Sequence, residues 1–282
     1  MKKTMIALLI AVLVVAIGAG LCFAGLSTVG FKFRNLDRTE YMKHTYTLAE
    51  PFDRIDIKGY TADVDIVAAQ GDTREVVVFE SEREKYTVSV EDGCLAIRPV
   101  DEGKSRWFLF GFHFKGPRIT LTVPQGAYEL LQVELDTGDL AVSDLAVETV
   151  LVNLDTGRAE ISGLQTTSIA AHSDTGDLRL SDMTPAQVEL SVDTGKIELV
   201  NLICSGDIRC ESSTGDIRLT DVDGANLYLS ASTGDITGTV RTQKVFSAES
   251  STGKVSVPDT AAGGRCEAET STGDIRLSIS GE

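Results

Sequence analysis

The residues of this chain that could do chemistry recur in one tripeptide. Asp-Thr-Gly begins at Asp136, Asp155, Asp174 and Asp193, and Ser-Thr-Gly begins at Ser213, Ser232, Ser251 and Ser271. Two Asp-Thr-Gly copies that face each other in a cleft could form the shared-proton acid–base pair of an aspartic protease. Serine cannot do that acid–base work. The later copies therefore favour a structural role, in which Asp or Ser bonds to the backbone of a turn.

The spacing of the tripeptide sets the fold. Its glycines recur at intervals of 19 or 20 residues, at Gly138, Gly157, Gly176, Gly195, Gly215, Gly234, Gly253 and Gly273. A period this strict is typical of a stack of identical supersecondary units. We interpret these glycines as structural turn residues, because glycine readily takes a positive φ.

Apolar residues alternate with polar ones on both sides of each Thr-Gly, as at Leu131, Val133, Leu140 and Val142 in the first copy. This period of two predicts strands with one buried face. Turn-forming residues stand six positions after the glycine, at Asp144, Gly163, Asp182, Asn201 and Asp221. No helix-period segment is available to cover a sheet. The pattern predicts an all-β fold, a parallel β-helix (β-solenoid) with coils of about 19 residues.

The charges support in-register stacking. One residue after each glycine, the chain carries in turn Asp139, Arg158, Asp177, Lys196, Asp216, Asp235, Lys254 and Asp274. Neighbours in this series are opposite in sign in six of seven steps. Parallel stacking would bring them to ~4.8 Å spacing, where opposite charges attract. These charges therefore have a structural explanation before a functional one.

We predict no catalytic, cofactor-binding or metal-binding residues. The aspartates near the turns suggest a calcium site, but calcium needs 6–8 oxygen ligands and basic residues interrupt the series. His44, His113 and His172 are scattered, and the cysteines lack metal-site spacing. With coils stacked in chain order, Cys210 and Cys266 would lie three coils apart, beyond disulfide reach.

The N-terminal region differs from the repeats. Lys2 and Lys3 precede an uncharged stretch that is long enough to span a bilayer as a helix of ~20 residues. We expect a transmembrane anchor over residues 1–31, with a cleaved signal peptide as the alternative. A linker over 32–44 follows. The expected protein is a single-pass cell-membrane protein with the bulk of the chain extracytoplasmic.

Residues 45–130 are expected to form an irregular β part that caps the regular solenoid of residues 131–282. A decayed repeat spans Ile55–Ile66, and strand-like runs follow at Glu75–Glu80, Tyr86–Val90, Leu95–Arg98 and Arg118–Val123. Solenoids need atypical end repeats to hide the open core. The last coil simply stops at the C-terminus, which leaves an open edge there.

An aromatic segment stands out where the repeat is absent. It contains Trp107, Phe108, Phe110, Phe112 and Phe114, between basic residues. It is either a hairpin strand packed on the cap or an exposed contact with a membrane or a partner. The net charge of −16 argues against nucleic acid as that partner.

The repeated [Asp/Ser]-Thr-Gly-[Asp/Lys]-[Ile/Leu/Val], behind a β-rich opening and a membrane segment, resembles the bacterial DUF4097 family over roughly residues 45–280. Members of that family are labelled putative adhesins. The resemblance implies a right-handed parallel β-helix in the bacterial envelope, and it carries no catalytic residues. We expect a non-enzymatic, membrane-anchored protein that binds an unknown protein or glycan. The alternatives are a carbohydrate-active lyase or hydrolase and an accessory regulator of a membrane signalling system.

Overall fold

The computed structural model describes residues 18, 40–82, 84–100 and 116–280. One compact unit comprises Tyr41–Glu102 and Gly116–Glu282. The other comprises Met1–Glu40 and Gly103–Lys115, of which only Gly18 and Glu40 are described. Within the described ranges, no helix is long and apolar enough to cross a membrane. The anchor predicted over residues 1–31 lies, apart from Gly18, outside the described residues.

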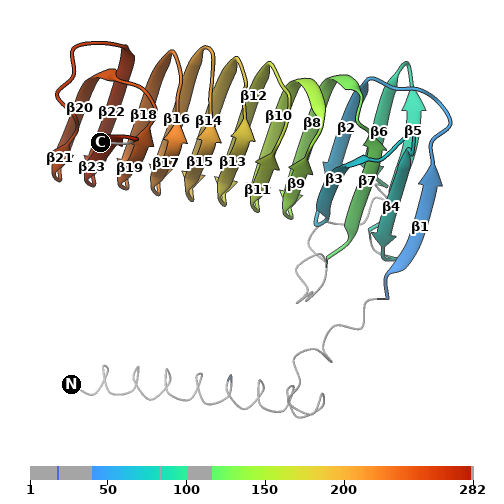
Figure 1. Ribbon diagram of the computed structural model, residues 1–282. Helices are drawn as coiled ribbons and strands as arrows, with labels where there is room; N and C mark the ends of the chain where they lie inside the picture. Colours follow the sequence, from blue (N-terminus) through green and yellow to red (C-terminus); the bar gives the residue numbers. More distant parts are fainter. Residues whose placement is uncertain (1–17, 19–39, 83, 101–115, 281–282) are drawn as a thin grey trace, which may run out of the picture. The chain divides into compact units, whose positions relative to one another are not determined.

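The larger unit consists of two β-sheets, and the prediction of an all-β fold is confirmed (Figure 1). Its strands are β1 (Met42–Thr47), β2 (Arg54–Gly59), β3 (Asp63–Ala69), β4 (Glu75–Glu80), β5 (Tyr86–Glu91), β6 (Cys94–Pro99), β7 (Arg118–Pro124), β8 (Ala127–Thr137), β9 (Leu140–Ser143), β10 (Ala146–Thr156), β11 (Ala159–Ser162), β12 (Ser168–Thr175), β13 (Leu178–Met183), β14 (Gln187–Thr194), β15 (Ile197–Leu202), β16 (Asp207–Thr214), β17 (Ile217–Val222), β18 (Asn226–Thr233), β19 (Ile236–Val240), β20 (Lys244–Thr252), β21 (Val255–Ser256), β22 (Gly264–Thr272) and β23 (Ile275–Ile279).

Each repeat supplies one strand to each sheet. Sheet A has the order β1-β4-β7-β3-β9-β11-β13-β15-β17-β19-β23-β21, and sheet B has the order β20-β22-β18-β16-β14-β12-β10-β8-β2-β6-β5. The repeat strands pair in parallel and in register, as where Val133, Val152 and Ala171 lie side by side. The stacked coils form the predicted β-solenoid.

The inward residues of both sheets form one continuous core of Val, Ile and Leu. Strand β14 illustrates the cause: its Val188, Leu190 and Val192 are buried and the residues between them are not. Because successive side chains of a strand point to opposite faces, most polar residues of the coils face outward, with Ser173, Ser212 and Thr270 as buried exceptions. The two outer sheet faces are therefore where a ligand can reach the molecule.

The decayed repeat at Ile55–Ile66 is a true coil. Strands β2 and β3 pair in parallel with β8 and β9, and this register places Ala62 opposite Gly138. The four strand-like runs that follow it correspond to β4, β5, β6 and β7. Strands β4 and β5 run antiparallel to their neighbours and, with β1, end the stack on this side. Strand β1 crosses the boundary predicted at residue 44.

A buried carboxylate ties this end of the stack to the first turn. Glu84 is only 4% exposed, and it accepts hydrogen bonds from the backbone N–H of Thr61 (3.1 Å), from the Thr61 hydroxyl (2.6 Å) and from the Tyr86 hydroxyl. Burial and the neighbouring Glu84 carboxylate raise the pKa of Tyr86 far above its ordinary value. Tyr86 and Glu84 thus close the core at the β1 side with satisfied polar groups.

The coils at the other end do not stack in chain order, and the prediction of an open edge at the last coil is wrong. Strands β22 and β23 insert between the coil of β18 and β19 and the coil of β20 and β21. The coil of β20 and β21 therefore ends the stack, as the red strands in Figure 1 show. Cys210 and Cys266 are two coils apart rather than three, and both are free thiols.

Pro258 explains this order. It stands five residues after Gly253, where other coils place a strand residue such as Ser181 or Ser278. Proline cannot donate to a β ladder, and β21 stops after two residues. At the edge of the sheet, this short strand has one neighbouring strand, so it shortens one hydrogen-bonded ladder. Inside the sheet it would have two neighbours and would shorten two ladders. The complete strand β23 therefore takes the inner place.

The insertion also needs two adjacent glycines. A Cβ on Gly263 would lie 1.8 Å from the carbonyl oxygen of Gln243, and one on Gly264 would lie 1.7 Å from that of Ala225. The chain entering β22 thus passes between the start of β20 and the start of β18 with room for backbone alone.

Candidate binding surface

The Thr-Gly turns form one corner of the solenoid. The eight motif glycines have φ between +140° and +156°. A Cβ on any of them would lie 1.7–2.1 Å from the carbonyl oxygen of the residue stacked beside it. Two structural reasons therefore require glycine here: the positive φ of the backbone and the close stacking of neighbouring turns. Neither reason is a catalytic one.

The second corner follows the same logic. Asp144, Asp182, Asn201 and Asp221 have φ between +49° and +60°, and Gly163 has +65°. These are the five turn-forming positions named from the sequence. Asp and Asn are the non-glycine residues that tolerate this left-handed region best.

Hydroxyl groups support the Thr-Gly turns, but not those of the motif serines. Ser212 and Ser250, each one residue before the motif, donate to the carbonyls of Gly215 (3.1 Å) and Gly273 (2.8 Å). In the part of the chain that the structure describes, Ser213 and Ser251 make no side-chain hydrogen bond. The expected bond from the motif residue to the turn is thus wrong at these copies, because that side chain points outward into solvent.

Where an aspartate stands one residue after the motif glycine, its carboxylate accepts a hydrogen bond from the next coil. The backbone N–H groups of Arg158, Lys196 and Lys254 donate to the carboxylates of Asp139, Asp177 and Asp274, at 2.9, 2.9 and 2.7 Å. The inserted coil makes the order Asp216, Asp235, Asp274, Lys254, so sign alternation fails at this end. Each of these three carboxylates still accepts an N–H from the next coil.

The outer face of sheet A is a lattice of ion pairs. Arg158 pairs with Glu160 (3.6 Å), Arg179 with Glu198, and Arg218 with Asp216 (2.9 Å). Among the described residues, no group of three or more His, Cys, Asp or Glu side chains could hold a metal ion. The arginines of this face are thus paired with carboxylates.

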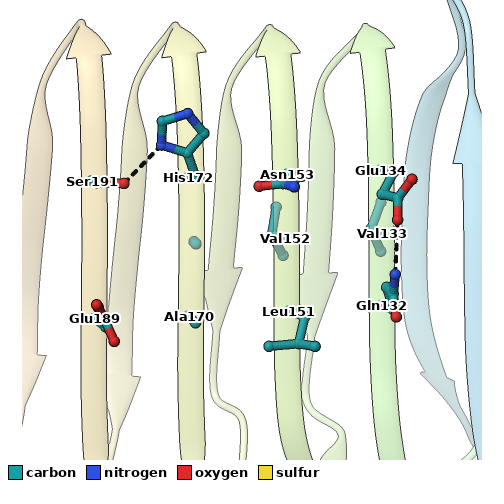
Figure 2. A pocket seen from close by; sticks show the side chains of 11 residues that line it. Gln132, Val133, Glu134, Leu151, Val152, Asn153, Ala170, His172, Glu189 and Ser191 are labelled. Carbon is teal, nitrogen blue, oxygen red and sulfur yellow. Dashed lines mark hydrogen bonds between the residues drawn. The ribbon is translucent and has the colours of Figure 1, made fainter.

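The outer face of sheet B has a shallow hollow of about 400 Å³ across β8, β10, β12 and β14 (Figure 2). Six of its outward side chains are uncharged, and we call them the neutral patch: Gln132, Leu151, Asn153, Ala170, His172 and Ser191. Leu151 is 38% exposed. Charged residues border the patch, with Glu134 on one side and Glu189 on the other, as Figure 2 shows.

Sequence reasoning missed this patch, although a signal was present. Four residues before the glycine, the repeats carry Asn153, His172 and Ser191 between Glu134 and Glu211. These three consecutive uncharged residues form the longest uncharged run in a column that contains four glutamates. Only the parallel register of β10, β12, β14 and β16 places them side by side.

Three residues at the patch form a hydrogen-bonded series. The Nδ1 atom of His172 lies 2.7 Å from the Ser191 hydroxyl, and its Nε2 atom lies 2.8 Å from the Asp174 carboxylate. A serine nucleophile also needs donors for the oxyanion. Backbone N–H groups inside the sheet are taken by the ladder, and Glu211 lies beside Ser191 in register. The series is therefore unsuited to acyl transfer, and it fixes the orientation of the imidazole.

The carboxylates at the patch do not suit glycoside hydrolysis. Lys58 donates to Glu134 at 2.5 Å and lowers the pKa of this carboxyl, whereas a general acid needs a raised one. Glu134 and Glu189 are three coils apart, ~14 Å at the spacing between strands. Paired glycosidase carboxylates lie about 5–9.5 Å apart.

The predicted aromatic contact residues Trp107, Phe108, Phe110, Phe112 and Phe114 lie outside the described residues. Their flanks are described. Val100 follows β6, and Gly116 precedes β7, which pairs with β3. A Cβ on Gly116 would lie 2.7 Å from the Thr61 carbonyl oxygen. Gly116 therefore lies at the corner where the repeats have Thr-Gly.

The buried cysteines behave as small apolar residues. Cys210 and Cys266 are 0% exposed in rows of Leu, Ile and Ala. Burial raises the pKa of both thiols to about 12. Thiols held in this protonated form are poor nucleophiles and poor metal ligands.

Comparison with known proteins agrees with this architecture. A family model described as Toastrack DUF4097 matches residues 52–282. The crystal structure of a putative adhesin from Bacteroides fragilis is similar, with a TM-score of 0.55, 16% identity, and coverage of 86% of this chain and 98% of that chain. That likeness shows the fold alone.

Two further crystal structures are from Parabacteroides distasonis. A putative adhesin has a TM-score of 0.41 and 12% identity, with coverage of 86% of this chain and 98% of that one. A putative lipid binding protein has a TM-score of 0.40 and 12% identity, with coverage of 84% and 95%. No curated protein sequence matches the chain.

Proposed function

Because the chain belongs to the Toastrack DUF4097 family, we propose that it is a non-enzymatic surface protein of the bacterial envelope. Its solenoid binds a protein or glycan partner through the neutral patch. Residues 1–31 anchor it in the cell membrane, and the solenoid is extracytoplasmic. The adhesin name of the Bacteroides fragilis structure supports a surface role.

The neutral patch is the observation that carries this proposal. The outer face of sheet A carries rows of ion pairs, and a ligand there would have to displace charged partners. At the patch, Leu151 and Ala170 offer apolar surface beside the amide of Asn153 and the imidazole of His172. Apolar surface with a few placed hydrogen-bonding groups is the usual composition of a binding site.

Site-specific crosslinking in membranes tests this role. The full chain would carry a photoreactive residue at position 151 or, as a control, at the exposed Val67 on sheet A. We expect a crosslinked partner from position 151 alone, and its loss when Ala170→Lys is added. Protease or glycosidase digestion of the product then separates a protein partner from a glycan. Equal products from both positions, or none from position 151, would refute the patch as the binding site.

The carbohydrate-active enzyme remains the weaker alternative, because the acids of the patch are too far apart and one is held ionised by Lys58. The regulatory alternative depends on the aromatic segment of Trp107 to Phe114. Replacing Trp107 and Phe110 by Ser should abolish association with a signalling partner if that role is correct. Unchanged association would exclude it.

A further inference from the structure

The two ends of the solenoid are closed differently. At the β1 side, Tyr86 is 4% exposed, and Phe52 and Tyr128 stack with ring centroids 6.0 Å apart. At the other side the core residues of the last coil are uncovered. Phe246 and Ala248 of β20 are half-buried, whereas Cys266 and Ala268 at the same positions of β22 are fully buried. The apolar core therefore reaches solvent at the coil of β20 and β21.

The two sheet edges at this end are also unequal. In sheet A, β21 has two residues, and Pro258 follows it closely. Short strands and proline are the devices that block pairing at an edge. In sheet B, β20 has nine residues and no proline, and its exposed Val245 is 44% accessible. Strand β20 is thus a long edge without such protection.

The free hydrogen-bonding groups of β20 follow from its pairing with β22. In a parallel pair, one residue of each register pair faces the other strand and its partner faces away. The Arg265 N–H donates to the side chain of Asn226 on β18 at 3.0 Å, so its register partner Val245 faces β22. Successive residues of a strand face opposite neighbours. Phe246, Ala248 and Ser250 therefore point their N–H and C=O groups away from β22, toward the open edge, where the Thr260 hydroxyl donates to the Lys244 carbonyl.

Charge selects the occupant of this edge. The chain has a net charge of −16, which opposes the meeting of two copies. The terminal coil carries few exposed charges, because Lys254 partly offsets Glu249 and Asp259, and the buried Lys244 is paired with Asp223. At the opposite end, β4 and β5 carry Glu75, Glu80 and Glu91 and no basic residue. The β20 end is therefore where two copies can approach with the lesser repulsion.

We propose that two copies of this chain associate end to end through antiparallel pairing of their β20 strands. Pairing centred on Ala248 places Ser247 of each copy opposite Glu249 of the other, so the two glutamates do not meet. The same two-fold contact covers Phe246, Ala248 and Val255 of both copies. Because β1 and β20–β21 lie at opposite ends of the stack, the two β1 strands lie farthest apart in the pair. This association is independent of the neutral patch.

Sedimentation velocity of the full chain in a density-matched detergent, over a range of protein concentrations, tests the proposal. Ala248→Pro removes an outward N–H and leaves the bonds to β22 in place, and Ser247→Glu places a carboxylate opposite Glu249 of the other copy. The control Val67→Glu adds the same side chain at an exposed residue on β3, away from this end. All three variants keep the N-terminal segment.

We expect a monomer–dimer equilibrium that Ala248→Pro and Ser247→Glu each weaken at least tenfold, while Val67→Glu leaves it unchanged. Circular dichroism melting of each variant verifies that the monomer remains folded. A wild-type chain that stays monomeric at every concentration would overturn the proposal. A dimer that persists in both β20 variants would also overturn it, because the contact would then lie elsewhere.

Discussion

At the scale of single residues, the repeated tripeptide is a device for stacking. Each motif glycine is held at positive φ with the neighbouring turn's carbonyl oxygen where its Cβ would be. The four Asp-Thr-Gly copies look like protease chemistry only when each is considered alone. Stacking explains why the glycine recurs without change while the first residue varies between Asp and Ser.

Substitution of a motif glycine should therefore be far more harmful than substitution of an ordinary turn glycine. Gly195→Ala would place a Cβ 2.0 Å from the Gly176 carbonyl oxygen, at φ +147°. We expect a loss of at least about 3 kcal/mol in the free energy of unfolding, from backbone strain and displaced stacking together. Chemical denaturation followed by circular dichroism measures it.

Gly71 is the matched control, since it also has positive φ (+89°) but has no atom within 4 Å of a Cβ. Gly71→Ala should cost about 1 kcal/mol, from conformation alone. Similar losses at the two positions would contradict the stacking argument.

The aspartates that accept hydrogen bonds from the next coil predict an acid limit to stability. The Lys254 N–H, followed by Arg276, lowers the pKa of Asp274, and Arg241 lowers that of Asp221. A lowered folded pKa adds stability above the unfolded carboxyl pKa of about 4, and this stability is lost as pH falls through the folded value. We expect the melting temperature to drop below about pH 4. Asp274→Asn should shrink that drop, and an unchanged profile would exclude Asp274 as a contributor.

At the scale of elements, residues that occupy the same position in successive coils form columns, and these columns differ in their contribution to stability. Two residues before the glycine, Asp136, Asp155 and Asp174 lie in consecutive coils, where like charges repel. One residue after the glycine, the Asp177 carboxylate accepts the Lys196 N–H of the next coil. The same residue type is thus unfavourable in one column and favourable in the other.

Asp155→Ser should stabilise the protein by about 0.5 kcal/mol at low salt, because later coils already carry Ser at this position. The gain should fade as ionic strength rises and screens the repulsion. Thermal melting at two salt concentrations measures both effects. Asp177→Ser is the control, and it should destabilise the protein because the Lys196 N–H loses its acceptor. Equal effects of the two changes would contradict the distinction between the columns.

Insertion of the last coil should depend on Gly264. In Gly264→Ala the Cβ would meet the Ala225 carbonyl oxygen at 1.7 Å, so β22 cannot lie between β18 and β20 without displacement. We expect amide hydrogen exchange to increase at least tenfold in β20, β22 and β23, with β8 to β14 still protected. Mass spectrometry of exchanged peptides measures this. Unchanged protection of β22 would show that the close approach is not limiting.

At the scale of the whole molecule, the solenoid is a rigid support with two distinct surfaces. The neutral patch lies on the side of the stack, over β8 to β14, and the unprotected edge lies at its end, at β20. A partner on the patch and a second copy on the edge can therefore bind at the same time. The six residues of the patch are uncharged, although acidic residues border them, and the coil of β20 and β21 carries few exposed charges.

The proposed anchor gives a prediction at this scale. The full chain should stay in the membrane fraction after alkaline carbonate washing, because an apolar span of ~20 residues inserts stably. A chain that starts at residue 40 should be released. Recovery of the full chain in the soluble fraction, or retention of the shortened one, would argue against an anchor in residues 1–31.

Much of this structure could be predicted because its determinants are local. The turn positions depend on Gly, Asp and Asn within single loops, and the strand faces depend on alternation over a few residues. The residues of each repeat of about 19 residues are therefore sufficient to determine the turns and strands of its own coil. Once the coils stack in register, equivalent residues of successive coils lie in columns.

The order of the last two coils and the position of the neutral patch depended on tertiary structure. Repeats that share one pattern can occupy each other's place in the stack. The order of the last two coils depends on the number of ladders that Pro258 interrupts, and on the close backbone approach at Gly263 and Gly264. The patch likewise exists only where Asn153, His172 and Ser191 lie side by side. The residue pattern within each repeat determined the structure of its coil. The pairing of coils with one another determined which coil ends the stack and which side chains lie together on the surface.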